Sequence, residues 1–162
     1  MKIYLASDHG GFNLKEVIKK TLLGEEHEVV DCGNDHYDAN DDYPDFVKKA
    51  AQAVHDNPDS RGIILGGSGQ GEVMVANRLS GVRCMLFYSL AVAKEPIDIK
   101  GTQSIDPFEI LRTSRVHNDS NMLSLGARFL NEDEVLKAVK IWLETPFLNE
   151  ERHARRIKKF NS

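Results

Sequence analysis

The sequence predicts an α/β fold in which helices cover both faces of a parallel sheet. Short apolar runs alternate with helix-like segments along the whole chain, which is the order that successive βαβ units produce. The short runs are apolar at nearly every position, as expected for strands that are buried on both faces. The length of 162 residues suits one hydrophobic core, so we expect residues 1–162 to form a single domain.

Five strands and the helices between them can be placed in order. We expect strands at 3–6, 29–30, 62–65, 82–87 and 122–125. We expect helices, from apolar residues at helical spacing, at 14–22, 46–54, 72–78 and 131–143, with a last helix at about 149–160. Asn131 followed three residues later by Glu134 is a capping-box pattern, which supports a helix start at this point.

The segment 94–115 is the least regular part of the chain. Pro96, Gly101 and Pro107 interrupt it, and helical periodicity is weak before Phe108. We therefore expect an inserted loop at about 94–115 that contains one helical turn. Connections longer than about 12 to 15 residues in a compact domain are usually functional or mobile.

Composition narrows the functions that are compatible with the sequence. No apolar run approaches the roughly 20 residues of a membrane span, and the first residues become polar too early for a signal peptide. We therefore expect a cytoplasmic protein that has no membrane partner. The net charge of −4 argues against a general affinity for nucleic acid. The two cysteines lack CxxC spacing, which argues against a disulfide framework and a cysteine zinc site.

Two loops that contain glycine are the first candidates for a site. Residues 8–11 follow the first expected strand, and residues 66–71 follow the third. In common doubly wound sheets these two strands are neighbours where the strand order reverses, and ligands bind there at the carboxyl ends of the strands. Backbone N–H groups in such a turn can receive a phosphate or an oxyanion. The run at 66–71 fits neither a dinucleotide fingerprint nor a Walker motif, so by itself it is equally consistent with a tight turn.

Glu72, directly after this loop, is a candidate general base. A carboxylate can remove a proton from carbon if burial raises its pKa toward the working pH. The N-terminus of a helix lowers the pKa of a nearby carboxylate, so burial must have the larger effect. The alternative is that Glu72 only stabilises the first turn of its helix.

The C-terminal segment is strongly basic although the chain as a whole is acidic. Arg152 and Arg156 are four residues apart and share one face of a helix, which suits them to bind the oxygens of one phosphate. The alternatives are a solvated helix or a modest nucleic-acid patch. No aromatic residue stands among these charges before Phe160, which makes the nucleic-acid interpretation the weaker one. The polar clusters at 41–44 and 117–119, taken singly, are typical of turns, caps or solvated faces.

The motifs follow one another along nearly the whole chain: Ser7-Asp8-His9-Gly10-Gly11-Phe12 with Leu14-Lys15, Asp42-Tyr43-Pro44, Gly67-Ser68-Gly69-Gln70-Gly71 with Ala76-Asn77, His117-Asn118-Asp119 with Asn121, Leu125-Gly126-Ala127-Arg128, and Arg152-His153-Ala154-Arg155-Arg156. Taken together and in this order, they resemble the motifs of the ribose-5-phosphate isomerase B family, which includes the galactose-6-phosphate isomerase subunits.

The resemblance implies a Rossmann-like three-layer α/β/α sandwich with a five-stranded parallel sheet. It implies an aldose–ketose isomerase without metal or cofactor that acts through a cis-enediolate, with ribose 5-phosphate and ribulose 5-phosphate as the expected pair. It also implies a homodimer whose sites are shared between the subunits, with a tetramer as the alternative. A hexose-6-phosphate isomerase, such as a galactose-6-phosphate isomerase subunit, and a non-catalytic sugar-phosphate-binding protein remain open.

The resemblance also implies roles for individual residues. Many members carry a cysteine base just before the glycine-rich loop, where this chain has Gly66, and a second group uses a glutamate after the loop, where Glu72 stands. Ser68, with the N–H groups of Gly69 and Gly71, is implied to stabilise the oxyanion. The other implied residues are His117 for ring opening, Asn118 for the enediolate, Asp8, Tyr43 and Gly67 for the sugar, and His9, Arg128, Arg152 and Arg156 for the phosphate, some of them from the partner subunit.

One segment departs from the family pattern. The connection from Ser89 to His117 is longer than the usual one by roughly a dozen and a half residues, and it precedes two implied site residues. This insertion leaves the substrate open. It is compatible with capping the pocket, narrowing it, or extending a contact between subunits.

Overall fold

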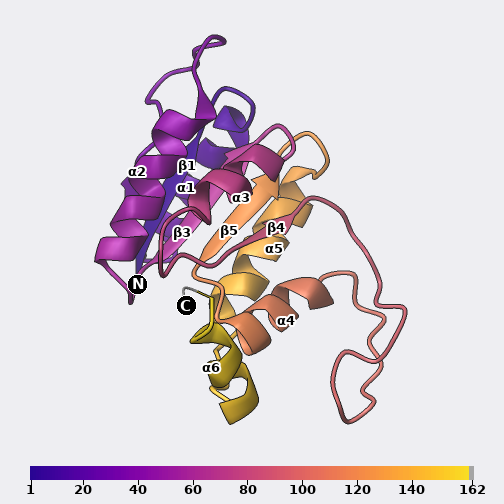
Figure 1. The fold of residues 1–162 in the computed structure, drawn as a ribbon. Coiled ribbons are helices and arrows are strands. Elements are labelled where there is room, and N and C mark those ends of the chain that lie inside the picture. Colours follow the sequence, from indigo (N-terminus) through magenta and orange to yellow (C-terminus); the bar gives the residue numbers. More distant parts are fainter. Residues whose placement is uncertain (161–162) are drawn as a thin grey trace.

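A five-stranded parallel sheet forms the centre of the computed structural model, which describes residues 1–160 (Figure 1). The strands lie side by side in the order β2-β1-β3-β5-β4. Their bounds are β1 Lys2–Ser7, β2 Glu28–Asp31, β3 Arg61–Gly66, β4 Cys84–Phe87 and β5 Met122–Gly126. The expected α/β fold with five parallel strands is confirmed, and β1 and β3 are neighbours at the point where the strand order reverses.

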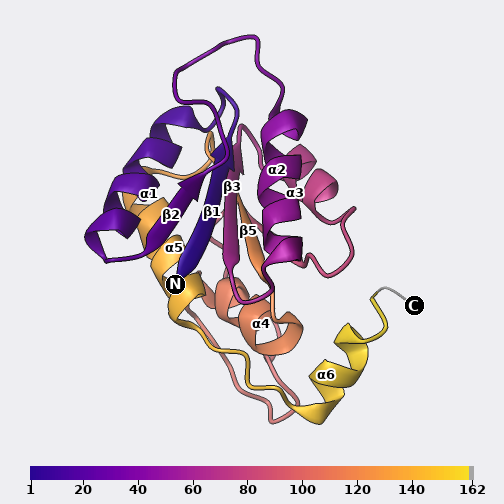
Figure 2. The ribbon, with the colours of Figure 1, turned by 90° about the vertical axis from the view of Figure 1, so that its left-hand side faces the viewer.

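Helices cover both faces of the sheet and form a three-layer sandwich (Figure 2). The pair α1 and α5 lies on one face, and the pair α2 and α3 lies on the other. The bounds of the helices are α1 Phe12–Gly24, α2 Tyr43–Asp56, α3 Gln70–Ala76, α4 Glu109–Asn118, α5 Glu132–Glu144 and α6 Glu151–Ile157. Among the described residues, no helix combines the length and the apolar character that a membrane span needs.

The strands are apolar on both faces because successive side chains enter different cores. In β1, Ile3 and Leu5 pack in the core beneath α1 and α5, whereas Tyr4 and Ala6 pack beneath α2 and α3. This alternation follows from the two-residue period of a strand. Trp142 of α5 is fully buried in the first core.

Helix α4 is longer than the sequence predicted. We expected one helical turn within 94–115, but α4 runs from Glu109 to Asn118, while residues 88–108 form no regular helix or strand. The buried face of α4 includes Ser114 and Arg115 as well as Leu111, so its helical period is not visible as an apolar pattern. The Arg115 guanidinium can be buried since its N–H groups have partners. It donates hydrogen bonds to an Asp119 carboxylate oxygen at 2.8 Å and to the Thr145 carbonyl at 3.1 Å.

Candidate active site

A pocket of about 450 Å³ lies at the carboxyl ends of β1 and β3, where the switch point predicts a ligand site. The loops after the two strands are in backbone contact, because a Cβ atom at Gly10 would lie only 2.9 Å from the nitrogen of Gly67. The pocket is lined by Asp8, His9, Gly10, Tyr43, Gly67, Ser68, Gly71, Glu72, Arg128 and Phe129. The first group of expected site residues therefore meets in one place.

The side chain of Glu72 is buried at the wall of this pocket. It belongs to the first turn of α3, and its carboxylate reaches back over the end of β3. A Cβ atom at Gly66 would lie 1.7 Å from Glu72 Oε1, so the carboxylate fills the space that any side chain at position 66 would need. Burial raises the pKa of Glu72, and the nearby carboxylate of Asp8 raises it further. Burial therefore outweighs the hydrogen bond from the Glu72 backbone N–H, which lowers the pKa.

The glycine-rich loop is shaped at Gly69, where a side chain does not fit. Gly69 has a φ of 74° and is the residue before α3, and a Cβ atom there would lie 2.6 Å from Leu86. The Ser124 hydroxyl donates to the Gly69 carbonyl at 2.8 Å and fixes this turn. Ser68 and Gly71 line the pocket, whereas Gly69 does not. Gly69 thus acts on the shape of the loop, and its expected contact with the substrate remains a prediction.

Tyr43 lies against the same loop from the other side. It is the first residue of α2, where Pro44 occupies the first turn. A Cβ atom at Gly71 would lie 2.5 Å from the Tyr43 hydroxyl oxygen, so this hydroxyl rests on the backbone of the loop and faces the pocket. The glycine at position 71 is required for this close approach.

The pocket also contains positively charged side chains. The backbone N–H of His9 donates to Asp41 Oδ1 at 2.9 Å, and His9 Nδ1 lies 2.8 Å from the same oxygen. This hydrogen bond to Asp41 raises the pKa of His9 and favours an imidazolium. The Arg128 guanidinium packs over Gly67, where a Cβ atom would lie 3.1 Å from Arg128 Cζ. Two cations at one end of a polar pocket suit a phosphate.

Asp41 is a site residue that the sequence analysis missed. The cluster at 41–44, taken singly, was interpreted as a turn, a cap or a solvated face, and the resemblance implied a role only for Tyr43. No signal in the sequence connected Asp41 with His9, which is 32 residues away. Within the described residues, Asp8, His9 and Asp41 are also the group that could ligate a metal ion, with one ligand atom of each lying within 4.8 Å of the others. Here His9 and Asp41 bind each other, and the same imidazole is close to the negative charge of Asp8 and the positive charge of Arg128.

The second group of expected site residues lies at the other end of the sheet. His117 and Asn118 are the last residues of α4, just before β5 begins at its amino end, and Arg152 and Arg156 belong to α6. Figure 1 shows α6 at the same end of the molecule as the N-terminus, which marks the amino end of β1. Because β5 has five residues, the two ends of the sheet are about 13 Å apart. One chain therefore does not bring this group into the pocket.

A stacked histidine pair holds the second group together. The rings of His117 and His153 are 4.2 Å apart with an angle of 15° between their planes. His153 is buried, and its Nε2 has no hydrogen-bond partner among residues 1–160, although a Glu150 carboxylate oxygen lies 3.8 Å away. Burial, with the nearby His117 and Arg152, lowers the pKa of His153. The sequence analysis had quoted His153 within a motif but had assigned it no role.

Similarity to known proteins identifies the family. The model of a family described as Ribose/Galactose Isomerase matches residues 3–105 and 99–160, so the chain belongs to this family. The two matched segments meet inside the irregular connection between β4 and α4.

Within this family, the chain is similar to proteins named ribose-5-phosphate isomerase B. The protein of that name from Mycolicibacterium paratuberculosis is 39% identical over 97% of this chain and 87% of its own length. The crystal structure of the Mycoplasma genitalium enzyme with bound ribulose-5-phosphate has a TM-score of 0.83 at 36% identity, covering 98% of this chain and 92% of its own. The Thermotoga maritima structure has a TM-score of 0.82 at 36% identity, covering 98% and 96%. The expected family is confirmed.

Proposed function

We propose that this chain is an aldose–ketose isomerase that interconverts ribose 5-phosphate and ribulose 5-phosphate. The observation that carries the proposal is the buried carboxylate of Glu72, which lies beside a glycine-rich loop in a pocket that His9 and Arg128 also line. The names of the similar proteins support it, as does the Mycoplasma genitalium structure with bound ribulose-5-phosphate. Such an enzyme would belong to the pentose phosphate pathway of the cytoplasm.

The residues of the pocket have different roles in the proposed reaction. His9 and Arg128 bind the phosphate and so place the first two sugar carbons at Glu72. The Glu72 carboxylate removes the proton from carbon 2 and returns it to carbon 1, while the hydroxyl proton moves from the oxygen of carbon 2 to that of carbon 1. Ser68 and the loop N–H groups stabilise the negative charge of the cis-enediolate, where one donor contributes on the order of 3 kcal/mol. Asp8 and Tyr43 bind the sugar hydroxyls.

A single assay separates this function from its alternatives. The purified protein is incubated in D₂O with ribose 5-phosphate and, in parallel, with hexose 6-phosphates, and the ketose product and the deuterium in the sugar are measured by NMR. We expect net conversion and deuterium at the carbon that receives the proton. Turnover of hexose 6-phosphates alone would instead indicate a hexose-6-phosphate isomerase. Thermal stabilisation by the sugar without turnover or deuterium would indicate a non-catalytic binding protein.

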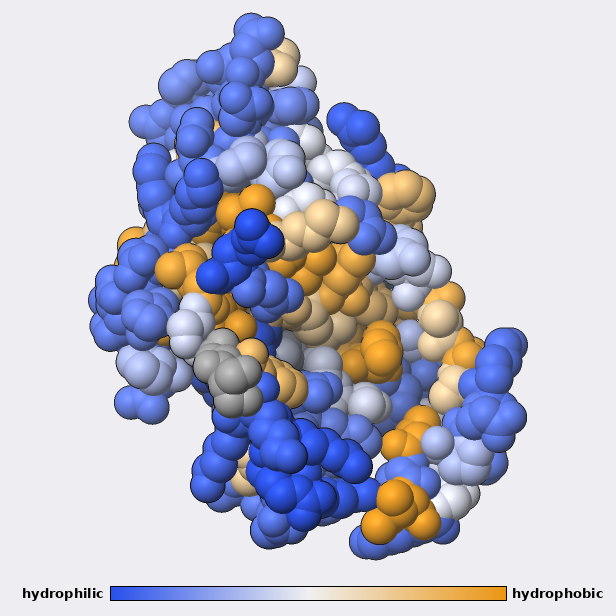
Figure 3. Space-filling model, viewed as in Figure 1, coloured by the Kyte–Doolittle hydropathy of each residue, from blue (hydrophilic) through white to orange (hydrophobic). Residues whose placement is uncertain are grey.

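We further propose that two copies of the chain complete each site. His117, Asn118, Arg152 and Arg156 lie at the amino end of the sheet, so a twofold arrangement in which each subunit presents this end to its partner's pocket would supply them. Apolar residues gather on the face that carries α3 and β4, where Met74 is 66% exposed (Figure 3). Such a patch is typical of a subunit interface. The same arrangement gives the basic C-terminal helix a phosphate to bind, and dimers that pair into tetramers are the alternative assembly.

Mixed dimers test the shared site. Glu72→Gln and His117→Ala are each expected to lose activity, because each removes one residue from both sites of a homodimer. After the two inactive proteins are mixed and their subunits exchange, half of the molecules are mixed dimers that each contain one intact site. We expect about a quarter of wild-type activity to return. If subunit exchange is verified by mass spectrometry and no activity returns, the two residues do not come from different subunits.

A further inference from the structure

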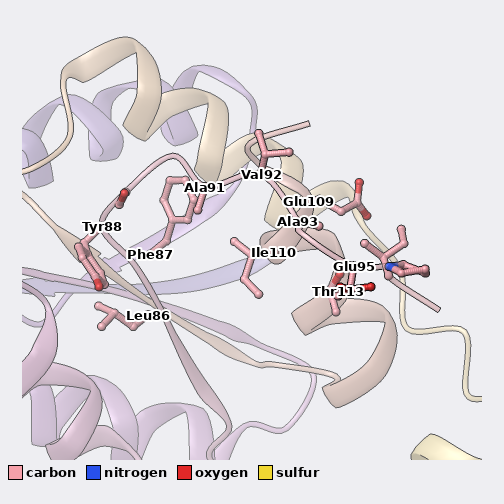
Figure 4. Close-up of a pocket in the computed structure, with 13 residues that line it drawn as sticks. Leu86, Phe87, Tyr88, Ala91, Val92, Ala93, Glu95, Glu109, Ile110 and Thr113 are labelled. Atoms are coloured by element: carbon pink, nitrogen blue, oxygen red, sulfur yellow. The ribbon is translucent and has the colours of Figure 1, made fainter. Parts of the chain in front are cut away.

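A second hollow lies on the β4 side of the sugar pocket and has no part in the proposed mechanism. It has a volume of about 470 Å³ and lies between β4, α4 and residues 91–97 of the irregular connection (Figure 4). Its lining is mainly apolar, with Leu86 and Phe87 from β4 and Ile110 from α4. This chain therefore has unfilled apolar space beside its candidate active site.

Two aromatic rings lie between this hollow and the sugar pocket. Tyr88 lines the hollow, and Phe129 lines the sugar pocket. Their ring centroids are 6.0 Å apart with an angle of 74° between the planes, which is a favourable edge-to-face contact. The two rings thus form a wall that the two cavities share.

The backbone fixes the position of this wall. A Cβ atom at Gly126 would lie 2.6 Å from Tyr88 Cβ and 2.9 Å from the carbonyl oxygen of Ser68, so Tyr88 and the oxyanion loop both pack against the end of β5. Phe129 follows Arg128, one of the two cations at the phosphate end of the pocket. Phe129 is 62% exposed, so its ring lies at the rim of the pocket.

We propose that Tyr88 and Phe129 set the length of the sugar phosphate that this chain accepts. The inference rests on the proposed isomerase function. His9 and Arg128 hold the phosphate end, and Glu72 and Ser68 hold the reacting end, on loops that are in close backbone contact. A sugar with one more carbon does not fit extended between these two ends, so its chain has to bulge sideways. On the β4 side the rings of Tyr88 and Phe129 block this bulge, although the second hollow lies behind them.

The test compares two substrates that differ by one carbon. D-Allose 6-phosphate repeats the configuration of D-ribose 5-phosphate and adds one carbon, and kcat/KM is measured for both with wild type and Phe129→Ala. A hydrophobic pocket discriminates against one extra methylene by about 10- to 200-fold, and this range serves as the scale for one extra CHOH group here. We expect wild type to prefer the five-carbon sugar within this range. Phe129→Ala should reduce the preference at least about tenfold, mainly by gaining activity on the six-carbon sugar.

Matched variants distinguish a role of the two rings in substrate length from a role in the fold alone. Phe129→Tyr keeps the ring and should keep the wild-type preference, and Tyr88→Ala should reduce the preference in the same direction as Phe129→Ala. A wild type that accepts both sugars equally would overturn the proposal. So would equal losses on both sugars in Phe129→Ala, because rings that only support the fold or a subunit contact affect both substrates alike.

Binding measurements keep the inference separate from the proposed function. Affinities for the unreactive acids 5-phosphoribonate and 6-phosphoallonate are measured by calorimetry. We expect wild type to bind the five-carbon acid more tightly, and we expect Phe129→Ala to reduce this preference, whether or not the protein turns over either sugar. If wild type turns over neither sugar but shows this binding pattern, the proposed isomerase function is wrong and the proposed role of Tyr88 and Phe129 is supported. If wild type is an active isomerase whose binding preference does not change in Phe129→Ala, only the wall fails.

Discussion

Glu72→Gln is expected to lower kcat/KM for ribose 5-phosphate by about 10² to 10⁴, the usual contribution of a general base. Glutamine has nearly the same shape as glutamate and fills the space beside Gly66, but its amide cannot accept a proton from carbon. Steady-state kinetics and the rate of deuterium uptake from solvent measure the loss. Glu132→Gln is the matched control, because it removes an exposed carboxylate from the first turn of another helix. Full activity in Glu72→Gln would exclude Glu72 as the base.

The same variant should be more stable than wild type, in a way that depends on pH. The pKa of Glu72 is raised in the folded chain, so ionising it destabilises the fold as the pH rises from the usual carboxyl pKa through the raised value. Glu72→Gln removes this penalty, and its Tm should exceed that of wild type at pH 8, with a smaller difference at pH 5. A Tm below that of wild type at pH 8 would instead indicate that Glu72 mainly stabilises its helix.

Gly66→Ala is expected to reduce kcat/KM for ribose 5-phosphate to a similar extent as Glu72→Gln, although it removes no functional group. The new methyl group would lie 1.7 Å from Glu72 Oε1, so the carboxylate has to leave its position, and a misplaced catalytic group can lose about 10²-fold in rate. The backbone of Gly66 is outside the left-handed region, so alanine fits its conformation. Steady-state kinetics and the Tm of the variant are measured together.

Gly24→Ala is the matched control for this change. A Cβ atom at Gly24 meets nothing within 4 Å, and its backbone is also outside the left-handed region. This variant should keep wild-type activity. If Gly66→Ala keeps it as well, the observed position of the Glu72 carboxylate is not the catalytic one.

The sequence was sufficient to predict the features that depend on short stretches of chain. The strands could be recognised in the sequence because each face of the sheet packs against its own core, so that nearly every strand position is apolar. Ile3 and Tyr4, which enter different cores, illustrate this. The position of Glu72 followed from a continuous motif, and the structure adds that burial determines the direction of its pKa shift.

Features that depend on distant contacts could not be read in this way. Helix α4 was underestimated because Arg115 faces the protein interior and finds partners beyond its own helix, including Thr145. Asp41 was missed because only the folded chain brings it to His9. The separation of His117 from Glu72 depends on which end of the sheet each loop reaches, and a list of motifs contains no such information.

The steric conflict at position 66 also limits how such an enzyme can change over time. A side chain at 66 and the carboxylate of residue 72 require the same volume, so the chain holds one of them or the other. A lineage that exchanges a base at one position for a base at the other passes through a form in which both groups compete or neither is present. The two positions are therefore coupled, because a side chain gained at position 66 requires that the carboxylate at position 72 is moved or lost.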